Sequence, residues 1–293
     1  MALPVTITIT QVASTDSPAN APTVWNTNVF QALEDLFGIP NALAVGRALL
    51  RSVLAGCQLS NDGTSPNTVI DVSAGIAMAS DQLLLMEIGA FTGATGGIWA
   101  TGSGSNKMDT STAVAANTWY HVYVIGGGGN ATDILFSLSA TAPTLPGTYT
   151  RQRRLGSFKT ASATSNILLF TQDGDYVIWA ASVLDVDATN PGINQVIRTL
   201  PSVPTGPNVF AILQVFTNAS AAVHISDLAA NNEAPSITVA PLETVGGGAA
   251  SGARILIRTN TLAQISTRNI SSGAGEILRI AVLGWYDRRG RDL

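Results

Sequence analysis

Apolar and polar residues alternate with a period of two at the start of the chain, where Val5, Ile7 and Ile9 are separated by threonines. This alternation predicts a strand with one apolar face. A connector rich in Ser, Asp, Pro and Asn follows over residues 14–22. Because an arm of this size cannot bury its own apolar face, we expect residues 1–25 to form an N-terminal docking arm that packs on a neighbour.

Helical spacing appears next. Apolar residues recur every three or four positions over 30–37, and a second apolar stripe follows over 42–54. Gly38 and Pro40 lie between the two stripes, as expected where one helix ends and another begins. The pattern predicts a short helical segment over residues 26–55.

From residue 56 onward the pattern is typical of β-structure, with short runs of branched and aromatic residues bounded by Gly, Asn, Asp, Pro or Ser. The runs cover residues 68–72, 76–79, 83–88, 119–125, 134–138, 167–170, 176–183, 196–200, 209–216, 222–225, 254–258, 262–267 and 277–283. We therefore expect a mainly β fold of antiparallel β-sandwich or jelly-roll-like modules, following the N-terminal arm and the helical segment.

The β region divides into a β-sandwich module over 56–190 and a second β module over 191–293. A segment with three prolines, residues 201–207, either separates the halves or forms a long crossover. The pattern leaves open whether the second module is continuous with the first.

Two of the predicted strands, 119–125 and 209–216, are apolar on both faces. In contrast, residues 254–258 alternate, with Ile255 and Ile257 facing one way and Leu256 the other. An antiparallel strand that is apolar on both faces must be covered on both. Since little helix is predicted, the second cover is expected from another sheet or another subunit, which indicates a homo-oligomer.

The composition excludes several classes of protein. Charged residues make up 12% of the 293, the net charge is −4, and lysine occurs only at Lys107 and Lys159. This argues against a nucleic-acid binder, which needs many contacts from Lys and Arg to phosphate. No apolar run is long enough for membrane insertion, and the N-terminus does not resemble a secretory signal. The single cysteine, Cys57, excludes an internal disulfide framework and a cysteine-based zinc site.

Catalytic and metal-binding motifs are absent from the sequence, so we expect no catalytic residues, no metal and no cofactor. A Ser–His–Asp arrangement could use only His121 or His224, and His121 lies within a predicted strand, where packing or a structural hydrogen bond explains it. The carboxylates could bind Ca²⁺ or act as acid and base on a glycan, but turn chemistry favours a structural role. These carboxylates are Asp173, Asp175, Asp185 and Asp187.

Two clusters of arginine are candidate interaction sites in this lightly charged chain. The first comprises Arg151, Arg153 and Arg154, and the second comprises Arg288, Arg289 and Arg291. Arginine binds carboxylates and phosphates well, so the first cluster could bind an acidic surface, although an ion pair between strands or subunits is favoured. In the second cluster, Asp287 and Asp292 alternate with the arginines, which suggests mutual pairing or docking onto a neighbour.

Several segments together resemble the tail-fibre and minor structural proteins of tailed bacteriophages. They are IWATGSG at 98–104, NTWYHVYVI at 117–125, APTLPGTYTRQRRLGS at 142–157, QDGD at 172–175 and the ending GWYDRRGRD at 284–292. The resemblance covers about half of the chain and does not extend to residues 1–55. It implies a non-enzymatic, commonly trimeric building block of a virion, which is assembled in the cytoplasm of the bacterial host.

Three functional hypotheses follow. In the leading one, the chain is a tail-fibre or tail-tip protein that docks onto other virion proteins through residues 1–55 and contacts a glycan or protein of the host surface. In the second, it is a capsid decoration or head-fibre protein. In the third, it is a glycan depolymerase that uses Asp173, Asp175, Asp185 and Asp187.

Overall fold

A computed structural model describes residues 52–110, 112–218, 223–235, 244–245, 250–270, 273 and 275–291. This part of the chain is mainly β and contains no helix. Among the described residues there is accordingly no helix long and apolar enough to span a membrane. The mainly β prediction is therefore confirmed. The predicted docking arm, residues 1–25, lies outside the described residues.

Most of the predicted helical segment, residues 26–51, also lies outside the described residues. At its end the prediction is wrong, because Leu54 and Ala55 belong to a strand, β1 (Leu54–Gly56). This strand pairs with β4 in an antiparallel register that places Leu54 opposite Ala77. The hydrogen bonds of a distant strand thus prevail over the helical spacing of the apolar residues.

The strands that follow in the described residues have these bounds: β2 Leu59–Asn61, β3 Val69–Val72, β4 Gly75–Met78, β5 Leu85–Ile88, β6 Phe91–Ile98, β7 Asn106–Met108, β8 Trp119–Gly127, β9 Asn130–Ser137, β10 Arg151–Lys159, β11 Phe170–Asp173, β12 Tyr176–Thr189, β13 Val196–Thr199, β14 Phe210–Asn218, β15 Val223–Ser226, β16 Thr244–Val245, β17 Ala250–Arg258, β18 Gln264–Asn269 and β19 Ile277–Tyr286.

The described strands form three sheets. A 12-stranded sheet has the order β10-β8-β9-β7-β6-β3-β2-β11-β12-β19-β14-β17, and it is accompanied by a three-stranded sheet, β1-β4-β5, and a four-stranded sheet, β13-β18-β15-β16. The large sheet is mixed, because β7 runs parallel to both β6 and β9. The expectation of purely antiparallel pairing is therefore corrected, and the jelly-roll arrangement is not confirmed.

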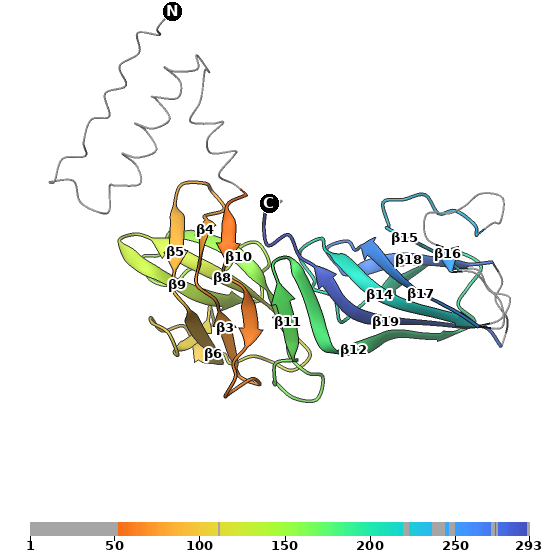
Figure 1. Ribbon diagram of the computed structural model, residues 1–293, viewed down its shortest axis with the longest axis horizontal. Coiled ribbons are helices and arrows are strands. Elements are labelled where there is room, and N and C mark those ends of the chain that lie inside the picture. Colours follow the sequence, from red (N-terminus) through yellow and green to blue (C-terminus); the bar gives the residue numbers. More distant parts are fainter. Residues whose placement is uncertain are drawn as a thin grey trace, which may run out of the picture.

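The large sheet continues from one half of the β region into the other. Strands up to β11 lie in one lobe and strands from β12 onward in a second lobe, with β11 and β12 side by side between them (Figure 1). Strand β12 also pairs with β19, so residues of the ranges 56–190 and 191–293 are hydrogen-bonded within a single sheet.

Three tryptophans pack at the junction of the lobes. The ring of Trp285 lies 5.5 Å from that of Trp119 and 5.0 Å from that of Trp179. The indole N–H of Trp119 donates to the carbonyl of Pro201, and that of Trp179 donates to the carbonyl of Ser202. The proline-rich segment 201–207 is thus a crossover from β13 to β14 that also covers the tryptophans.

The two predicted strands that are apolar on both faces differ in how they are covered. In β8 every residue from Trp119 to Gly126 is buried, and Trp99, Leu145 and Tyr149 pack over the second face. In β14 the residues of one face, such as Leu213, are buried, but Phe210 on the other face is exposed. The second cover of β8 therefore comes from this chain, whereas the corresponding face of β14 remains open in the described structure.

Replacing Gly284 tests how closely β12 and β19 approach each other. Between Ile178 and Val183 the register of this pair shifts, and a Cβ atom added at Gly284 would lie 2.1 Å from the carbonyl oxygen of Val177. We expect Gly284→Ala to lower the free energy of unfolding by about 1–3 kcal/mol, because backbone atoms must move to make room. Denaturant titration would measure this, with Gly63→Ala, whose added Cβ meets nothing within 4 Å, as the control. Equal effects of the two substitutions would contradict the prediction.

Candidate functional site

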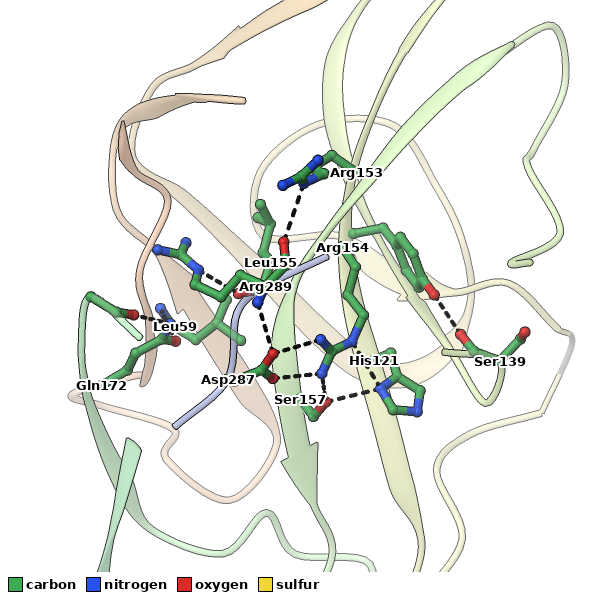
Figure 2. A network of polar contacts seen from close by, with 12 residues as sticks. Leu59, His121, Ser139, Arg153, Arg154, Leu155, Ser157, Gln172, Asp287 and Arg289 are labelled. Atoms are coloured by element: carbon green, nitrogen blue, oxygen red, sulfur yellow. Dashed lines mark hydrogen bonds and ion pairs between the residues drawn. The ribbon is translucent and has the colours of Figure 1, made fainter. Parts of the chain in front are cut away.

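The two predicted arginine clusters meet in the folded chain. Arg153 and Arg154 lie on β10, and Arg289 follows the end of β19; all three side chains are buried and belong to one polar network (Figure 2). Sequence spacing alone does not show this contact, because more than 130 residues separate the two clusters. Folding thus joins the two clusters into one buried network.

The centre of the network is an ion pair between Arg154 and Asp287. The two terminal nitrogens of Arg154 donate to the two carboxylate oxygens of Asp287, with N–O distances of 2.8 and 2.6 Å. Both side chains are 2% exposed. Two parallel hydrogen bonds of this kind are the strongest geometry available to an arginine and a carboxylate. An irregularity of β10 between Arg154 and Gly156 accompanies this arrangement.

Arg289 fixes the segment after β19 against the first lobe. Its Nε donates to the carbonyl oxygen of Leu155 at 2.8 Å, and Nη2 donates to the carbonyl oxygens of Gly56 and Cys57. Its backbone N–H donates to Asp287 at 2.8 Å, while its carbonyl oxygen accepts from Nε of Arg153. The guanidinium groups thus satisfy backbone carbonyls that would otherwise be buried without partners.

His121 and Ser157 complete the network. Arg154 donates to Nδ1 of His121 from Nε at 3.3 Å and to the hydroxyl of Ser157 from Nη2 at 2.6 Å. Because a guanidinium can only donate, Nδ1 of His121 must be the acceptor, and the ring proton lies on Nε2. The Ser157 hydroxyl, 2.9 Å from Nδ1, then donates to the same nitrogen.

Burial and the arginine set the protonation of the site. Burial, reinforced by Arg154 and opposed by Asp287, lowers the pKa of His121 to about 3 from an ordinary value of 6.5, so the ring is neutral. Burial acts to raise the pKa of Asp287, but the charge and hydrogen bonds of Arg154 outweigh it and lower the pKa overall. The site therefore holds a charged pair beside a neutral histidine.

The Ser157–His121 contact has the geometry of a nucleophile and its base, but the surroundings differ from those of a catalytic triad. Asp287 binds Arg154 rather than the imidazole, and His121 and Ser157 are buried. A substrate has no access to either group in this arrangement. The contacts suit a structural role, holding β8, β10 and the end of β19 together.

The remaining predicted arginines lie apart from the centre of the network. Arg151 pairs with Asp81 at 2.7 Å, and Arg291 pairs with Asp175. Arg288 is exposed. Of the six arginines in the two clusters, only Arg151, Arg288 and Arg291 retain enough exposure to contact a partner directly, whereas the three buried ones act within the chain.

The four carboxylates proposed for glycan chemistry do not share one site: Asp185 and Asp187 line a groove, whereas Asp173 and Asp175 lie where β11 turns into β12. Asp185 accepts both the N–H and the hydroxyl of Ser202, and Asp187 pairs with Arg279. A groove of about 330 Å³ is lined by residues 185–188 and 197–199, including these two aspartates. Across the described ranges, no group of three or more His, Cys, Asp and Glu side chains is placed to hold a metal ion.

Sequence reasoning missed one buried ion pair. Nζ of Lys107 lies 2.7 Å from a carboxylate oxygen of Asp133, and both side chains are almost fully buried. The ammonium also lies 5.0 Å from the ring centre of Phe91 and 5.3 Å from that of Trp99. The only signal in the sequence was the scarcity of lysine. A chain with only two lysines does not rely on them for solubility, so each is a candidate for a specific contact.

Replacing Asp287 tests the central ion pair. We expect Asp287→Asn to lower the free energy of unfolding by about 3–5 kcal/mol, because Arg154 would remain buried without its counterion. Denaturant titration measures the change. Asp187→Asn, which removes the exposed partner of Arg279, is the matched control and should cost no more than about 1 kcal/mol. A similar cost for both would show that the buried pair has no special role.

The low pKa of His121 predicts acid sensitivity. Between pH 6.5 and about 3 the unfolded chain binds a proton that the folded chain does not, so stability is full above pH 6.5 and falls with pH in this window. The slope contributed by one such group approaches about 1.4 kcal/mol per pH unit. His121→Asn keeps an acceptor but does not titrate, so its unfolding free energy should depend less on pH between 6 and 4. Parallel pH profiles for both proteins would contradict the prediction.

Comparison with known proteins adds no assignment. No protein-family model matches the chain, and a search of curated proteins finds no match either.

Proposed function

We propose that the chain is a structural protein of a tailed-bacteriophage particle, of the tail-fibre or tail-tip type. In this proposal its two β regions are sandwich-like modules, it forms a homo-oligomer, most simply a trimer, and it performs no catalysis. Residues 1–55 dock onto other virion proteins, and the β modules contact a glycan or protein of the host surface.

The observation that carries the proposal is that the segments resembling virion proteins, although separate in the sequence, contribute to one buried polar network. The segment 142–157 contributes Arg153, Arg154 and Ser157, the segment 117–125 contributes His121, and the ending 284–292 contributes Asp287 and Arg289. These separate parts of the resemblance meet in one buried network. Their residue types are thus explained by folding, as expected of a building block.

The chemistry of the described residues supports a passive role. His121, Ser157 and Arg154 have side chains of the kinds used in catalysis, and they bind one another inside the fold. Adhesion needs no such centre, because weak contacts on several linked copies gain strength from their high effective concentration. A capsid decoration or head-fibre protein would have the same requirements and differs in its place on the particle.

Antibodies raised against the chain test its location and role. We expect immunogold labelling at the tail tip or tail fibres of the phage particle, and we expect the same antibodies to block adsorption to the host. The measurement is electron microscopy together with an adsorption assay, using antibodies against a major capsid protein as the control. Labelling of the capsid without an effect on adsorption would favour decoration, and absence of the chain from particles would overturn the proposal.

A further inference from the structure

One face of the second lobe is apolar and open to solvent. It is formed by β12, β19, β14 and β17, and we call it the outer face. Its exposed or half-buried apolar residues include Tyr176, Leu184, Phe210, Leu256 and Tyr286, whereas Ile212 on the same face is only 6% exposed. The exposed fractions are 52% for Leu184, 39% for Phe210, 47% for Leu256 and 41% for Tyr286. Contiguous apolar surface of this kind marks an interaction site more often than does a scattered exposed residue.

The register of the strands makes the outer face continuous. Tyr176, Tyr286 and Phe210 lie directly opposite one another on β12, β19 and β14. The rings of the two tyrosines are 5.1 Å apart. In the next row Ile212 lies opposite Leu256. The alternate residues of these strands are buried on the opposite side of the sheet, so the apolar rows point away from the core.

Charges of opposite sign lie at the two edges of the outer face. Asp173 on β11 is paired with Tyr176 in the sheet register, and Arg258 on β17 is paired with Phe210. Arg258 already forms an ion pair with Asp227 of the same chain. Arg254 lies on the same side of β17 as Arg258. The side chains of Asp173 and Arg254 form no hydrogen bond or ion pair with any residue that the structure describes. One edge thus offers an anion and the other a cation.

We propose that the outer face is the surface through which one copy of this chain binds a second copy. This inference rests on the proposed homo-oligomer and names the contact that forms it. With strands spaced about 4.8 Å apart, the five strands from β11 to β17 span about 20 Å. The apolar rows then form the dry centre of an interface, and Asp173 and Arg254 are the unpaired charges of its rim.

The distribution of charge indicates why the partner is another copy. When identical copies are arranged in a closed ring with their outer faces toward the axis, the β11 edge of one copy meets the β17 edge of the next. Asp173 of one copy then approaches Arg254 of its neighbour. A surface whose own edges are complementary needs no other molecule to neutralise them.

The test measures the association of the full chain by sedimentation velocity at micromolar concentration. We expect an oligomer, and we expect Leu256→Asp to raise the dissociation constant about 30-fold or more, as for a central interface residue. Because Leu256 is exposed, the unfolding midpoint of the dissociated copy should not fall. Leu262→Asp is the matched control, since this leucine is 60% exposed in the turn between β17 and β18 and lies outside the outer face.

Charge reversal tests the rim. Asp173→Arg alone should weaken association, because it opposes Arg254 of the neighbouring copy, and adding Arg254→Asp should restore it at least in part. Loss of association in both the single and the double variant would overturn the pairing of the two edges.

Three other results would overturn the inference. They are a monomeric full chain, association that Leu256→Asp does not change, and a Leu256→Asp chain that loses stability as a monomer, which would mean that the same chain covers the face. If Leu256→Asp abolished the binding of host polysaccharide but left the oligomer unchanged, the face would be assigned to a glycan instead. A dimer that Leu256→Asp dissociates would support the outer face and count only against the proposed trimer, while labelling of particles tests the virion role separately.

Discussion

The buried ion pair between Arg154 and Asp287 is the central electrostatic contact between the two lobes. It connects a strand at one edge of the large sheet to the segment after β19, and it is shielded from water on all sides. Burying two charges is costly unless each is fully hydrogen-bonded, and here Asp287 accepts both terminal nitrogens of Arg154 and the N–H of Arg289. Removing one partner alone would leave the other charge buried without compensation.

The tryptophans extend this junction with apolar contacts. Trp119, Trp179 and Trp285 come from three different strands, and the crossover at Pro201 and Ser202 satisfies two of their indole groups. Polar and apolar contacts therefore fix the same boundary. Among the described residues, His121, Ser157, Arg154 and Asp287 therefore contact one another inside the fold rather than facing solvent.

The β character of the chain was predictable wherever one side of a strand is covered. Residues 254–258 alternate in the sequence and alternate in burial, with Ile255 and Ile257 inside and Leu256 outside. Strand β10 was not predicted, because Arg151, Gln152, Arg153 and Arg154 obscure the period of two. Its polar residues are buried only because distant partners satisfy them, and a local pattern cannot contain that information.

The sequence by itself determined the fold class, the scarcity of charge and the presence of strands that need two covers. Only the tertiary structure decided that the two arginine clusters meet, that Lys107 pairs with Asp133, and that β8 is covered on both faces while β14 is not. The physical reason is the range of the interactions. Period and turn chemistry act between neighbours in the chain, whereas ion pairs and face-to-face packing join residues that folding alone brings together.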